Sequence, residues 1–195
     1  MLNRTQFFIR EHVGLLKLSG TYDILDPQTK APIGQAREEI SGLVKFFRLL
    51  IDKSLMPTRI SVYAGSGERP TQLVFSIRRG PALLRPKVFV SDATGAPLGY
   101  FQSKVFSLGG AFRVFAADGT EVALVQGDWK GWNFRFLSGT TELGVVTKKW
   151  AGFGKELFTT ADSYVVSLHG TSSPAMSTLL LAAGLAIDTV LKEKQ

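Results

Sequence analysis

Four stretches of the chain repeat one pattern of hydrophobic and polar positions. Each has a β-rich run, a polar turn that usually contains glycine, and a second β-rich run. They are KVFVSDATGAPLGYFQSKVF, AFRVFAADGTEVALVQGDW and WNFRFLSGTTELGVVTKKW, preceded by a weaker copy, TYDILDPQTKAPIGQAREE. Asp118-Gly119 and Ser138-Gly139 supply the positive φ that tight hairpin loops need, and Asp92 to Gly95 suits a slightly longer loop. The pattern therefore predicts four β-hairpins.

Alternation within the strands separates a buried face from a wet one. The predicted core-facing sets are Trp132, Phe134 and Phe136 in one strand and Leu73, Phe75 and Ile77 in another; Asn133, Arg135, Ser76 and Arg78 take the wet faces. Further β-rich runs lie at Arg59 to Tyr63 and at Ser163 to Leu168. A meander of this size protects its edges by closing, so we expect a mainly β fold, a closed antiparallel barrel of about 12 strands.

Two segments depart from the strand pattern. In EEISGLVKFFRLLIDK, Glu38 to Lys53, apolar residues recur at helical spacing, which predicts one short amphipathic helix near residues 39–53. Its basic side chains would suit a membrane surface, but the simpler interpretation is a helix packed on the barrel rim with its basic side in water.

The second segment is the tail, SPAMSTLLLAAGLAIDTVLKEKQ. Ser173 and Pro174 are a favourable N-cap and first helical residue, and Lys192 and Lys194 suit the C-terminal end of the helix dipole. The uncharged part, residues 175–187, would be about 20 Å long, whereas a bilayer core needs about 30 Å. It is apolar nearly all round, so we expect a buried helix threaded through the barrel, with a membrane segment as the alternative.

Length and composition fit one globular domain over residues 1–195. The N-terminus does not resemble a secretory signal and the chain has no cysteine, both of which suit a cytoplasmic protein. The segment from Lys45 to Lys87 holds nine basic and two acidic residues, so its net charge of +7 equals that of the whole chain. Such a local excess indicates an anionic partner, either lipid head groups or nucleic acid, or simply a solvated face.

The titratable residues form no catalytic constellation. His12 and His169 lie far apart in sequence and are expected in surface or loop positions. Asp26-Pro27 is a turn signal, and Asp23 is expected to accept from the backbone rather than to form a catalytic pair with Asp26. We therefore expect that the protein is not an enzyme and that it binds no cofactor.

The three tryptophans, Trp129, Trp132 and Trp150, are the remaining aromatic candidates, because lysines lie beside them. They could sit at a membrane interface or stack on a base, but the simpler interpretation is that they cap the ends of the barrel. Since the aromatic side chains are expected to point inward, nucleic acid is a less favoured partner.

The chain resembles the tubby C-terminal superfamily, in its phospholipid scramblase and LURP-one-related branch. The residues that carry the resemblance are YDILDP, IGQARE, the V-x-V-x-D-x-x-G hairpins, and TKKWAGFGKELFTTADSYVVSL followed by LLLAAGLAIDTVL. The resemblance extends from about Tyr22 to Leu191. It implies a barrel around a central apolar helix, and a role in phosphoinositide binding or calcium-dependent lipid movement.

The chain differs from scramblases in the segment before the last helix. In scramblases the calcium site is attributed to an acidic segment before the last helix that begins Asp-Ala-Asp, whereas here the segment reads Thr160-Ala161-Asp162. Calcium takes six to eight oxygen ligands, commonly from several carboxylates, and this segment offers one. We therefore expect no strong calcium site.

The leading hypothesis is a non-enzymatic lipid-interaction module, peripheral at a membrane, that binds anionic phospholipid or phosphoinositide head groups. The expected head-group residues are Lys45, Arg48, Arg78, Arg79, Arg85 and Lys87. Two alternatives remain: phospholipid scramblase activity proper, which requires the last helix to enter the bilayer, and a regulatory scaffold whose basic segment meets an acidic protein or nucleic acid.

Overall fold

The computed structural model of the chain describes residues 1–12, 20–39, 57–67, 69–80, 87–103, 111–128, 132–148, 163–170 and 173–187. Twelve antiparallel strands lie in these ranges. They are β1 (Gln6–Glu11), β2 (Thr21–Leu25), β3 (Pro32–Glu39), β4 (Thr58–Ala64), β5 (Gln72–Arg79), β6 (Lys87–Asp92), β7 (Pro97–Ser103), β8 (Phe112–Ala116), β9 (Glu121–Asp128), β10 (Asn133–Ser138), β11 (Thr141–Thr147) and β12 (Ser163–Leu168).

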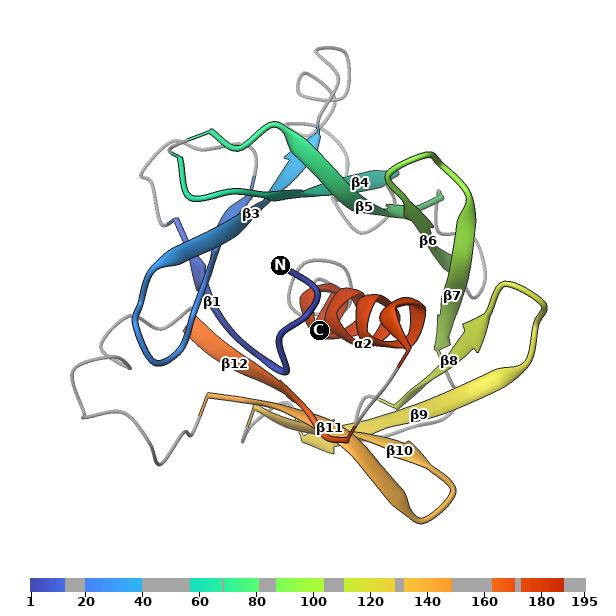
Figure 1. Cartoon of the computed structure of the whole chain (residues 1–195). Helices are drawn as coiled ribbons and strands as arrows, with labels where there is room; N and C mark the ends of the chain where they lie inside the picture. The colour runs from blue at the N-terminus through green and yellow to red at the C-terminus, as the bar shows by residue number, and fades with distance from the viewer. Residues whose placement is uncertain are drawn as a thin grey trace, which may run out of the picture.

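The strands close into a barrel. Each pairs with its neighbours in sequence, and β12 pairs with β1, where Phe8 lies opposite Val165. Closure leaves none of the twelve described strands with an open edge along which another strand could add. The predicted fold class, a closed antiparallel barrel, is therefore confirmed (Figure 1).

The four predicted hairpins are β2–β3, β6–β7, β8–β9 and β10–β11. Gly119, in the turn between β8 and β9, has a φ of 86°, which only glycine adopts without strain. In the β6–β7 turn the Asp92 carboxylate accepts the backbone N–H groups of Thr94 and Ala96. The strands predicted around Arg59 and at 163–168 are β4 and β12.

Alternation places one face of each strand in the barrel interior. Trp132, Phe134 and Phe136 are buried, as predicted, and so are Phe75 and Ile77. The prediction is wrong at Leu73, since Val74 packs against the core instead. The register between β4 and β5 shifts at this point, because Val62 pairs with Phe75 and Tyr63 pairs with Leu73. Val74 is therefore the extra residue of a β-bulge, and it reverses the alternation of buried and exposed positions at Leu73.

Helix α2 (Pro174–Ala186) lies inside the ring of strands, as Figure 1 shows. Ser173 is its N-cap and accepts the backbone N–H of Met176, and Pro174 occupies the first turn, as predicted. Every residue from Thr178 to Ile187 is buried. The predicted central helix is therefore confirmed, while Lys192 and Lys194 lie outside the described residues.

Small residues let α2 approach the barrel wall. A Cβ atom on Gly184 would lie 2.8 Å from a methyl group of Val166 and 3.3 Å from one of Val146. Real Cβ atoms essentially never come that close, so the strands pack directly on the helix backbone. In the part of the chain that the structure describes, no helix has the length and apolar character needed to cross a bilayer.

The helix predicted near residues 39–53 is not tested, because residues 40–53 lie outside the described residues. Glu38 and Glu39, which open the predicted segment, are the last two residues of β3.

Candidate functional site

Two arginines face each other on the outer wall of the barrel. Arg59 on β4 pairs directly with Arg78 on β5, and both side chains are exposed. Like charges in directly opposed positions destabilise a sheet. Glu39 relieves one of them, since its Oε2 lies 3.2 Å from Nε of Arg59. Among the described residues, none forms an ion pair or hydrogen bond with the side chain of Arg78, so this guanidinium suits an external anion.

The adjacent strand adds a cation and an apolar side chain. Phe89 on β6 lies directly opposite Arg78, and Lys87 lies two residues before Phe89 on the same outer face. A groove of about 520 Å³ runs between β4, β5 and β6, and Arg59, Arg78 and Phe89 line it together with small residues such as Ser76 and Ser91. We call this set, Arg59, Arg78, Lys87 and Phe89 around the groove, the basic groove.

The structure divides the six predicted head-group residues. Arg78 lines the groove and Lys87 lies beside it on β6, while Lys45, Arg48 and Arg85 lie outside the described residues. Arg59, which the predicted set omitted, belongs to the groove.

Arg79 requires a correction, because its side chain points into the barrel. It is 1% exposed, and its Nη2 donates a hydrogen bond to Oγ1 of Thr58 over 3.3 Å. Neighbouring residues in a strand point to opposite faces, so Arg78 and Arg79 cannot both reach the surface. Arg79 is therefore a buried residue of the barrel and not a surface ligand.

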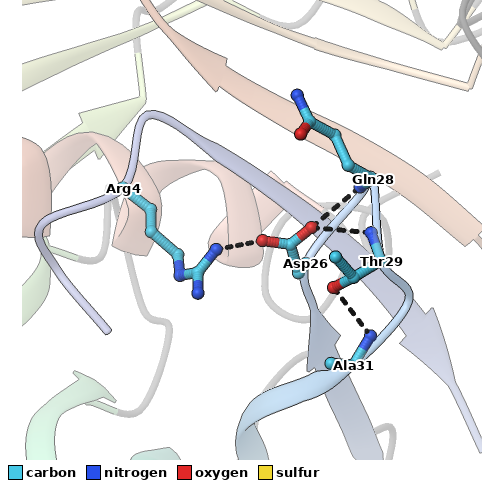
Figure 2. A network of polar contacts seen from close by, with 5 residues as sticks. All are labelled: Arg4, Asp26, Gln28, Thr29 and Ala31. Atoms are coloured by element: carbon cyan, nitrogen blue, oxygen red, sulfur yellow. Dashed lines mark hydrogen bonds and ion pairs between the residues drawn. The ribbon is translucent and has the colours of Figure 1, made fainter.

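Asp26 organises the turn between β2 and β3, as Figure 2 shows. Its carboxylate accepts the backbone N–H groups of Gln28 and Thr29, each over 2.9 Å, and also pairs with Arg4. The hydrogen bond from Thr29 is the main cause that lowers the pKa of Asp26, and it outweighs the effect of burial. This confirms the turn predicted at Asp26-Pro27.

Asp23 does not behave as predicted. Its carboxylate lies on the outer wall among three side chains, 3.0 Å from Arg10, 2.6 Å from Nε2 of His12 and 3.2 Å from Gln35, rather than accepting from the backbone. Burial raises the pKa of Asp23, but the contacts with these three side chains lower it by more in total. Asp23 is therefore held as a carboxylate by its partners.

The two histidines lie apart. His12 contacts Asp23, whereas Nδ1 of His169 lies 3.5 Å from Glu142. Among the described residues, no three His, Cys, Asp or Glu side chains gather as metal ligands. The segment Thr160-Ala161-Asp162, which the resemblance relates to a calcium site, lies outside the described residues.

Trp132 is a core residue rather than an exposed aromatic. It is buried, its ring lies 5.1 Å from that of Tyr164, and Nζ of Lys148 lies 4.5 Å from the ring centre. Trp129 and Trp150 lie outside the described residues.

One expectation about the aromatic residues was wrong, because they do not all point inward. Phe89, Tyr100 and Phe115 form a row across β6, β7 and β8 on the outer wall. The signal was present in the sequence. In KVFVSD the alternation that buries Val88 and Val90 also turns Phe89 outward.

The comparison with known proteins returns one family. A family model described as Scramblase matches residues 69–194, well over half of the chain. The matched stretch contains Arg78, Lys87 and Phe89 as well as α2, and it begins after Arg59. No curated protein and no solved structure matches the chain.

Proposed function

Because the chain belongs to the Scramblase family, within the tubby-like and LURP-one-related superfamily, we propose that it is a peripheral lipid-binding module. In this proposal it carries out no catalysis and binds anionic phospholipid or phosphoinositide head groups at the basic groove. The observation that carries the proposal is the opposed pair Arg59 and Arg78, which a phosphate group would stabilise.

The charges of the groove suit reversible membrane binding. A Lys or Arg close to an anionic leaflet contributes about 1 kcal/mol, so Arg59, Arg78 and Lys87 together contribute about 3 kcal/mol. Guanidinium groups also bind phosphate oxygens through two parallel hydrogen bonds, which a lysine ammonium cannot do. Lys45, Arg48 and Arg85 stay predicted head-group residues on the evidence of the sequence alone.

Scramblase activity proper, the first alternative, would require α2 to leave the barrel for the bilayer. Nine of its residues are buried, and its 13 residues would span about 20 Å of a hydrocarbon core of about 30 Å. We therefore favour a module that keeps α2 inside the barrel. For the regulatory scaffold, the second alternative, we find no feature among the described residues that favours it over the lipid-binding module.

Co-sedimentation with lipid vesicles tests the proposal. We expect the protein to bind phosphatidylserine or phosphoinositide vesicles at low salt, to bind less at physiological salt, and to ignore neutral phosphatidylcholine vesicles. Calcium and chelator should give the same result. Absence of binding to anionic vesicles, together with binding of DNA that weakens steeply with salt, would overturn the proposal in favour of the scaffold.

A further inference from the structure

Among the described residues, Phe89 is the one large hydrophobic residue whose side chain is exposed to solvent. It is 48% exposed, whereas Phe75, Phe101 and Phe134 are at most 1% exposed. The side chain stands in the basic groove, directly opposite Arg78 and two residues after Lys87. An apolar ring and two cations therefore share one patch of the outer wall.

Neighbouring side chains hold Phe89 in place from one side. The ring of Tyr100 lies 6.1 Å from that of Phe89 and stacks on Phe115 at 4.7 Å, with 14° between the planes. Nζ of Lys87 lies 4.2 Å from the centre of the Tyr100 ring. Tyr100 and Phe115 are partly buried by these contacts, so only Phe89 projects from the row.

This arrangement fits a bilayer interface better than a nucleic acid strand. A single-stranded nucleic acid stacks successive bases on several open ring faces, and here Lys87 and Phe115 already cover Tyr100. A bilayer places anionic phosphates beside an apolar boundary within a few ångströms, which matches two cations on the same face as one exposed apolar ring.

We propose that Phe89 inserts into the acyl boundary of an anionic bilayer while Arg78 and Lys87 contact the phosphates. The barrel then docks on its side, on the outer wall of β5 to β7, with α2 still enclosed. This inference rests on the lipid-binding function proposed above and adds the depth and orientation of docking.

A fluorescent label at position 89 tests the insertion. The chain has no cysteine, so Phe89→Cys can be labelled with an environment-sensitive nitrobenzoxadiazole probe at that site alone. The control is Thr141→Cys, at an exposed position of β11, five strands away around the barrel. On phosphatidylserine vesicles we expect a blue shift and an intensity increase at position 89, and no change at position 141.

Phe89→Ala gives a second, label-free measurement. Loss of one inserted ring should weaken partitioning into anionic vesicles by about tenfold. Salt screens charge contacts but not apolar burial, so the loss should persist at high salt, unlike that caused by Arg78→Gln. Thr141→Ala should bind as the unchanged protein does.

The outcomes separate the inference from the function on which it rests. If the labelled proteins sediment with anionic vesicles but position 89 stays in water and Phe89→Ala binds normally, the inference fails and the lipid-binding function stands. If none sediments, both fail. A response of the label to a single-stranded oligonucleotide instead of vesicles would also overturn the inference.

Discussion

Gly184→Val is expected to lower the free energy of unfolding by about 3 kcal/mol or more, because overpacking a tightly filled core forces neighbouring groups to move. A Cβ at this position would already lie 2.8 Å from Cγ2 of Val166, and valine adds two further methyl groups. The helix cannot retreat, since its residues from Thr178 onward are buried. Urea unfolding followed by circular dichroism measures the change.

Two variants separate crowding from helix propensity. Gly184→Ala gains about 1 kcal/mol of helix propensity, which offsets part of the cost of the same contact, so it should destabilise the protein much less than Gly184→Val does. Ala175→Val places the larger side chain on the exposed first turn of α2 and should cost well under about 1 kcal/mol. A Gly184→Val protein as stable as Ala175→Val would show that the helix is not held tightly by the barrel.

The double substitution Arg78→Gln/Lys87→Gln is expected to weaken binding to anionic vesicles by about 30-fold at low salt, since each cation contributes about 1 kcal/mol. Both side chains are exposed, so unfolding should be almost unchanged. Vesicle partitioning across a salt series measures the loss, which should shrink as salt rises.

Two controls make this prediction specific to the basic groove. Lys30→Gln/Arg135→Gln removes the same charge at exposed positions elsewhere on the barrel and should weaken binding much less. Arg79→Gln should instead lower stability, because it removes a buried hydrogen-bonding group one residue along the chain. Equal losses from both double variants would mean that net charge, and not the groove, drives binding.

The hairpins and the central helix were predictable because their signals are local. Turn residues such as Asp118-Gly119, alternation along each strand, and the Ser173-Pro174 start all act within a few residues. β1 was not predicted. Phe7 and Ile9 face the core while Phe8 is buried on the outer wall beside Leu25 and Val165, so its apolar residues run on without alternation.

The candidate site was only partly predictable. Alternation alone would have separated Arg78 from Arg79, because the strand that buries Phe75 and Ile77 also turns Arg79 inward. The opposition of Arg59 and Arg78 could not be predicted, since it depends on the register between β4 and β5 and on the bulge at Val74. The charge count located the basic segment, and only the register located the groove.

We propose that the barrel docks through the basic groove while α2 stays enclosed. Amide hydrogen exchange of the protein, free and bound to phosphatidylserine vesicles, tests both parts in one measurement. We predict added protection in β5, β6 and the β6–β7 turn around Gly95, with equally slow exchange of α2 in both states. Faster exchange of α2 on binding, or protection confined to β10 and β11, would contradict the claim.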